Sequence, residues 1–157
     1  MLLREELFHP IVSHFPIAMY FLAWGVSLVL LFFKTDSPKR NYLNGLVSFL
    51  LYVGAPFLLL SIFLGDMAFE ITKKNLCSIS KAYEHESYAE YSLVALIIAI
   101  LVHSILQYPD LKAKIVPRLR SILLALVLSV GVAYLGWTAH LGGQLVYEQG
   151  AGVARDM

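Results

Sequence analysis

Residues 43–64, LNGLVSFLLYVGAPFLLLSIFL, form an uncharged and almost wholly apolar stretch that decides the fold class. A helix of about 20 such residues is long enough to cross the hydrocarbon core of a bilayer. The stretch lacks the alternation of apolar and polar residues that a transmembrane strand shows. It therefore predicts a membrane-spanning helix, whose backbone groups are all hydrogen-bonded within the segment.

Three further stretches have the same character, namely Phe15–Phe33, Tyr88–Leu106 and residues 122 to about 145. Short connections between such helices place neighbours antiparallel. We therefore expect an all-α integral membrane protein, an up-down four-helix transmembrane bundle with residues 1–157 as a single domain. No internal repeat is visible, and the first span lacks the flanking pattern of a cleaved signal peptide.

The composition of the whole chain agrees with a membrane protein. Of 157 residues, 59% are hydrophobic and only 15% are charged, against roughly a quarter charged in a soluble domain. The 12 Lys and Arg residues and 11 Asp and Glu residues nearly cancel, which leaves no positive field to attract nucleic acid. The single Cys77 forms no intrachain disulfide, and no motif for covalent haem attachment is present.

Basic residues are distributed unevenly between the two ends of the predicted bundle. The loops 34–42 and 107–121 carry seven of them, and the terminal segments together with the loop 66–87 carry five. Basic residues in short loops favour the cytoplasmic side of a membrane. We therefore expect a multi-pass protein of the bacterial inner membrane with both termini in the periplasm.

Four of the five histidines are expected at the outward end of the bundle. His9 and His14 precede the first span, His85 precedes the third, and His140 lies roughly 27 Å along the fourth helix. Asp66 ends the second span at the same level. Taken alone, each of these residues is an ordinary polar side chain at the interface between the membrane and water. The joint pattern favours a ligand layer, because ionisable residues within membrane helices usually have a function.

Two glycines share a helical face with His140, Gly136 four residues before it and Gly143 three residues after it. This spacing leaves room for the edge of a flat cofactor, and it equally suits close packing of helices in a membrane. His9 and His14 are separated by about 140° on a helix, so one face does not carry both.

The two ends of the chain resemble a known family. The motif HPxxxHFPxA at residues 9–18 and the motif GGxxVYxxGxGV at residues 142–153 are similar to those of the bacterial predicted-membrane-protein family catalogued as domain of unknown function number 2231. The similarity spans nearly the whole chain, although its middle part matches only in hydropathy. The resemblance implies a small four-helix membrane protein without a settled activity. Members joined to rubredoxin-like or cytochrome-like modules imply a link to electron transfer.

The histidine layer predicts a b-type haem protein. Non-covalent haem in a helical bundle is held by neutral imidazoles from different helices, between apolar walls. His9, His14, His85 and His140, with Gly136 and Gly143 beside the cofactor, allow several axial pairs and one haem b or two. Such a protein transfers single electrons between a quinone pool and a periplasmic redox partner, and is a carrier rather than an enzyme.

Two alternatives stay open at this point. The same four histidines with Asp66 offer the nitrogen and oxygen ligands that suit an iron, copper or zinc ion without porphyrin. In the other alternative the chain is an accessory membrane subunit without a cofactor, and its histidines only meet lipid headgroups. A homodimer is compatible with each of these functions. No role is predicted for His103.

Overall fold

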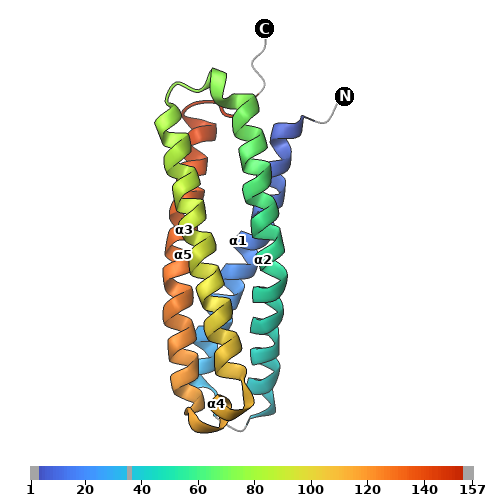
Figure 1. The fold of residues 1–157 in the computed structure, drawn as a ribbon, viewed down its shortest axis with the longest axis vertical. Helices are drawn as coiled ribbons and strands as arrows, with labels where there is room; N and C mark the ends of the chain where they lie inside the picture. The colour runs from blue at the N-terminus through green and yellow to red at the C-terminus, as the bar shows by residue number, and fades with distance from the viewer. Residues whose placement is uncertain (1–3, 35–36, 154–157) are drawn as a thin grey trace.

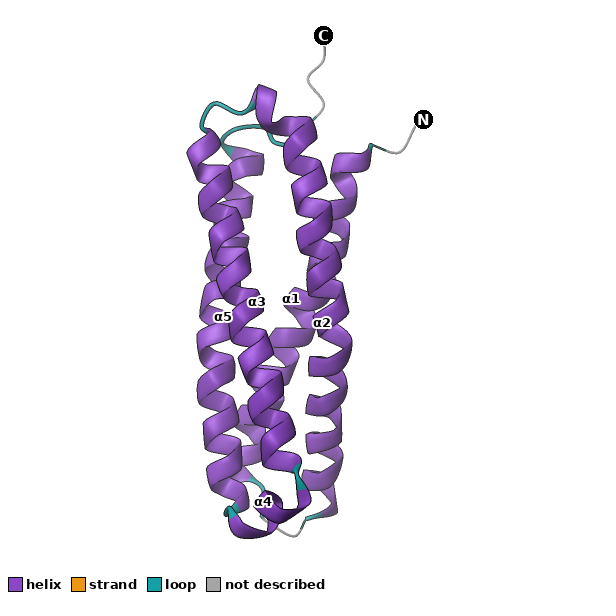
Figure 2. Ribbon diagram, viewed as in Figure 1, coloured by secondary structure: helices purple, strands orange, loops and turns teal. Residues whose placement is uncertain are grey.

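The computed structural model describes residues 4–34 and 37–153, and these residues form helices joined by short connections (Figure 2). The four long helices are α1 (Phe8–Val29), α2 (Pro38–Thr72), α3 (Ile79–Gln107) and α5 (Pro117–Tyr147). The short helix α4 (Pro109–Lys114) lies in the connection between α3 and α5. Single turns of 3-10 helix stand at Glu5–Leu7, Leu30–Phe32 and Lys73–Asn75.

The long helices form one up-down bundle, which confirms the predicted fold class (Figure 1). We call the end at which α1 begins and α5 ends the terminal end, and the opposite end, which carries α4, the loop end. Packing is most extensive between α1 and α2 and between α3 and α5, and is smaller between α1 and α5 and between α2 and α3. The fold is therefore two helical hairpins side by side, the first hairpin (α1 and α2) and the second hairpin (α3 and α5).

Four helical segments are long and apolar enough to cross a membrane, so the chain is a membrane protein with four candidate spans. The segments are Glu5–Phe32, Pro38–Asn75, Ile79–Gln107 and Pro117–Tyr147. Two of them begin with a proline, which suits the first helical turn because the backbone N–H there has no partner within the helix.

The helices extend well beyond the predicted apolar spans at the terminal end. His9 and His14 lie within α1 and His85 lies within α3, rather than before these helices. Likewise α2 does not end at Asp66 but continues to Thr72. Helical structure thus persists into the polar flanks, since a helix satisfies its backbone hydrogen bonds in water as well as in lipid.

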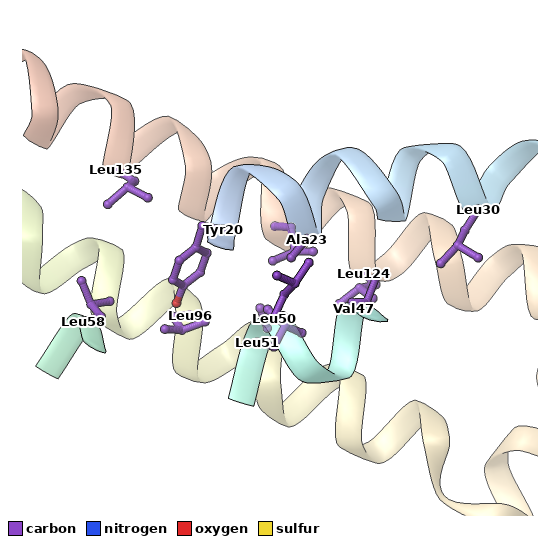
Figure 3. Packing of buried hydrophobic residues seen from close by; sticks show 12 residues of the cluster. Tyr20, Ala23, Leu30, Val47, Leu50, Leu51, Leu58, Leu96, Leu124 and Leu135 are labelled. Carbon is purple, nitrogen blue, oxygen red and sulfur yellow. The ribbon is translucent and has the colours of Figure 1, made fainter. Parts of the chain in front are cut away.

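The large buried side chains occupy the middle of the bundle and its loop end. Figure 3 shows the cluster that they form around Tyr20, Leu51 and Leu96. Toward the terminal end the cluster reaches Leu58 on α2 and Leu135 on α5. Among the described residues beyond that level the buried side chains are small or polar, apart from Pro16 and Leu141. They are Ser61, Ala82, Ser92, Thr138 and Gln149.

A buried arginine ties the loop end together. Arg40 is 4% exposed, and its Nη1 donates to the main-chain oxygens of Leu30 at 2.7 Å and Phe33 at 3.1 Å. Its Nη2 donates to the main-chain oxygen of Pro117 at 2.7 Å and to Ser121 Oγ at 2.6 Å. The guanidinium group therefore links the end of the first span to the start of α5, and its buried donors are paired as buried polar groups require.

Candidate functional site

His9 lies in the first turn of α1 and is hydrogen-bonded to α2. Its Nδ1 is 2.8 Å from the main-chain oxygen of Ser61. Because a carbonyl oxygen only accepts, Nδ1 carries the proton of the neutral ring and Nε2 keeps a free lone pair. Gly65 lies one turn beyond Ser61, and a Cβ atom there would meet Cε1 and Nδ1 of His9 at 3.1 Å. The glycine therefore makes the room that the imidazole occupies.

His85 on α3 has the same relation to α5. Its Nδ1 is 2.9 Å from the main-chain oxygen of Thr138, so its Nε2 is likewise the unprotonated nitrogen of the neutral ring. Gly142 lies one turn beyond Thr138, and a Cβ atom there would meet Cε1 of His85 at 3.1 Å. Both rings are thus held by a backbone carbonyl of the partner helix in their own hairpin.

The two imidazoles meet across the boundary between the hairpins. Both residues are half-buried, their ring centroids are 6.1 Å apart, and their planes are inclined by 86°. Two imidazoles on opposite sides of one metal atom have ring centres about 6.2 Å apart, given about 2.0 Å from metal to nitrogen and about 1.1 Å from nitrogen to ring centre. The separation of the ring centres of His9 and His85 therefore equals, within about 0.1 Å, the distance that one shared metal atom requires.

The other two histidines of the predicted layer do not join this pair. His14 is exposed, and its Nδ1 is hydrogen-bonded to the oxygen of Pro10 one turn earlier in the same helix. His140 is also exposed, and its ring lies against Trp137 with a centroid separation of 5.2 Å. Each of the two therefore interacts with its own helix instead of with a partner across the bundle.

The glycines that accommodate histidines are not those selected from the sequence. A Cβ atom at Gly136 or Gly143 would meet no other heavy atom within 4 Å in the described part of the chain, so these two positions border open space. Gly65 and Gly142 are the glycines that contact imidazole rings. Each of them lies one turn after a residue whose main-chain carbonyl accepts a hydrogen bond from a histidine. Only the structure reveals this relation, so neither glycine could be selected from the sequence.

The described residues do not assemble a metal site from protein ligands alone. Asp66 is exposed beside Gly65, and no group of three His, Cys, Asp or Glu side chains within residues 4–34 and 37–153 is placed to hold a metal ion. A haem iron needs fewer protein ligands, because the porphyrin supplies four nitrogens and two axial positions remain.

His103 lies elsewhere, in the loop-end half of the bundle, and is 2% exposed. Its Nε2 is 2.7 Å from Ser48 Oγ, and that hydroxyl donates to the main-chain oxygen of Asn44 at 3.0 Å. Since the hydroxyl has one hydrogen, Nε2–H of His103 donates to Ser48. This is the opposite tautomer from His9 and His85, and it is typical of a hydrogen-bonded structural histidine. Cys77 is exposed and free.

We expect Ser48→Ala to lower the free energy of unfolding by about 1–2 kcal/mol, because the buried Nε2–H of His103 loses its acceptor. Unfolding of the purified protein in mixed micelles with increasing SDS measures this change. Ser13→Ala is the matched control, since Ser13 Oγ makes an exposed hydrogen bond to Pro10. If both substitutions lowered the free energy of unfolding equally, the hydrogen bond between Ser48 and His103 would not stabilise the protein as proposed.

A family model described as a predicted membrane protein (DUF2231) matches residues 6–155. The matched region contains both hairpins and both members of the histidine pair. No curated protein and no solved structure matches the chain.

Proposed function

The chain belongs to the DUF2231 family of predicted membrane proteins, a description that names no activity, and we propose from its geometry that it is a membrane-embedded b-type haem protein. His9 and His85 are the axial ligands in this proposal. The observation that carries it is the pair of imidazoles from different hairpins, whose ring centroids are 6.1 Å apart and whose planes are inclined by 86°.

The two Nδ1 hydrogen bonds prepare both rings for ligation. A histidine that binds a metal through one nitrogen usually donates its other N–H to a carbonyl or carboxylate, which fixes the ring orientation and raises its basicity. His9 and His85 each have such a bond, to the main-chain oxygens of Ser61 and Thr138. Both acceptors are main-chain oxygens within helices, so their positions are fixed by the helix and do not depend on a side-chain rotamer.

The packing around the pair also supports a bound flat group. The buried hydrophobic cluster reaches only Leu58 and Leu135 toward the terminal end. Of the buried residues near the histidines, Ser61, Ser92 and Thr138 are small and polar, and Leu141 is large and apolar. A bulky cofactor at this level therefore displaces no large side chain of that cluster.

Two histidine ligands leave no open position on a haem iron, and this coordination suits electron transfer rather than catalysis. The proposed role is the transfer of single electrons between a quinone in the bilayer and a redox partner that approaches the terminal end. In this proposal the protein lies in the bacterial inner membrane, and the terminal end faces the periplasm, because the loop-end connections carry more basic residues.

The proposal predicts a coloured protein with about one haem per chain when it is produced in cells supplied with haem precursor. After purification in detergent, dithionite reduction is expected to sharpen the Soret band and to resolve α and β bands, and the pyridine haemochrome assay gives the stoichiometry. A folded protein that contains stoichiometric iron, copper or zinc without porphyrin would contradict the proposal and favour a bare metal site. A folded protein with neither group would favour an accessory subunit.

The proposed orientation predicts that alkaline phosphatase fused after Met157 is active in intact cells, because this enzyme matures only outside the cytoplasm. A fusion after Lys114 in the loop-end connection is the matched control and is expected to be inactive. The reverse pattern of activities would contradict a periplasmic terminal end.

A further inference from the structure

The first helices of the two hairpins bury their residues at matching positions. His9 and His85 define a fixed offset in residue number. When this offset is added to five buried residues of the first span, it gives five residues of α3 that are also buried. It pairs Pro16 with Ser92, Tyr20 with Leu96, Ala23 with Ala99, Ser27 with His103, and Leu30 with Leu106. The identities of the residues differ in three of these pairs, which explains why no repeat is visible in the sequence.

The second helices of the hairpins match in the same manner. The offset that carries Ser61 onto Thr138 differs by one residue from the previous offset, and it again superimposes buried positions. It pairs Val47 with Leu124, Leu51 with Leu128, Gly54 with Gly131, and Leu58 with Leu135. The same offset carries Gly65 onto Gly142, the two glycines that contact the histidines.

Interactions between side chains repeat together with the burial pattern. Phe15 stacks on Phe57 with a centroid separation of 5.3 Å, and the equivalent residues Tyr91 and Tyr134 are 5.7 Å apart. The helix contacts agree, because α1 packs on α5 as α3 packs on α2, and both contacts are smaller than those within a hairpin.

We infer that the chain is a tandem duplication of one helical hairpin, and that a pseudo-two-fold axis along the bundle passes between His9 and His85. The inferred repeat lies in the burial pattern and in the side-chain contacts, so it is not visible in the sequence alone. Parallel repeats related by an axis along the membrane normal occur in other membrane proteins. Here such an axis explains why one histidine of each repeat, its carbonyl acceptor and its glycine meet at the boundary between the hairpins.

The duplication specifies how the ligand of the proposed function is held, and this step rests on that function. In this arrangement His9 and His85 would hold the iron equally, one from each repeat, and the rest of the group would extend toward the terminal end, because Leu58, Leu135 and the rest of the buried cluster fill the other direction.

Gly65 and Gly142 become equivalent positioning residues in this arrangement. We expect Gly65→Ala and Gly142→Ala each to weaken haem binding by about 10–100-fold in haem titrations of the apoprotein. The effects of the two substitutions are expected to agree within about threefold. The controls are Gly54→Ala and Gly131→Ala, where a Cβ atom makes ordinary contacts at 3.4 Å to Met19 and 3.5 Å to Ala95. Haem binding that is lost in only one of the two site variants would overturn the equal sharing of the ligand.

A second measurement tests the duplication without haem. In a Cys77→Ser background, spin labels are placed at Leu59 and Ile98 in one variant and at the equivalent exposed positions Leu22 and Gly136 in another. Double electron–electron resonance is expected to give the same mean distance for both pairs. Clearly different distances would overturn the duplication whatever the haem content. Equal distances in a protein that binds no haem would support the duplication and remove the proposed function.

Discussion

Replacing His9 or His85 by alanine is expected to reduce the haem content of the purified protein by at least about tenfold, or to leave a high-spin haem with one axial ligand. Each substitution removes one of the two imidazoles proposed to bind the iron. The change is measured by the haem-to-protein ratio and by the loss of the sharp α band in the reduced spectrum.

The matched controls are His14→Ala and His140→Ala, since both side chains are exposed at the same end of the bundle. These variants are expected to keep the spectrum of the unmodified protein. Imidazole added to His85→Gly restores low-spin haem if the lost ligand is the only defect. Haem loss in His14→Ala or His140→Ala, with retention in His9→Ala and His85→Ala, would contradict the assignment of the ligands.

Arg40→Ala is expected to lower the free energy of unfolding by about 3 kcal/mol or more, because the hydrogen bonds that the buried guanidinium donates are lost. The affected acceptors are the main-chain oxygens of Leu30, Phe33 and Pro117 and the hydroxyl of Ser121. Unfolding in SDS mixed micelles measures the change in the absence of haem, so that a loss of cofactor does not contribute.

Two neighbouring substitutions calibrate this effect. Arg40→Lys keeps the charge but lacks the planar fork of donors, and it is expected to recover only part of the lost stability. Lys39→Ala alters an exposed side chain beside it and is expected to change the unfolding free energy by less than about 0.5 kcal/mol. An effect of Arg40→Ala as small as that of Lys39→Ala would show that the buried guanidinium does not stabilise the loop end.

The membrane-spanning helices were predictable because the apolar cores of the spans are long and continuous. The ends of the helices were not, since the bilayer constrains only residues within its core. The residues that surround His9 and His85 are polar enough for water, so hydropathy did not place the start of α1 at Phe8 or the start of α3 at Ile79. Tertiary packing of the hairpins keeps these flanks helical.

The histidine pair was only partly predictable. Spacing correctly indicated that His9 and His14 point in different directions, but helical phase alone did not show which of them faces the bundle. The acceptors of the Nδ1 hydrogen bonds are main-chain oxygens, which every residue possesses, so Ser61 and Thr138 carry no recognisable signal. The duplication was hidden for a related reason, because burial was retained at equivalent positions such as Ser27 and His103 while the side chains changed.

Whether one iron is bound by both His9 and His85 is decided by the low-temperature EPR spectrum of the oxidised protein. The planes of the two imidazoles are inclined by 86°, and near-perpendicular axial rings on ferric haem give a low-spin signal dominated by one large g value. We expect this signal, and we expect it to disappear in His9→Ala and in His85→Ala. A high-spin ferric signal in the unmodified protein, or a folded protein without haem iron, would contradict ligation by the pair.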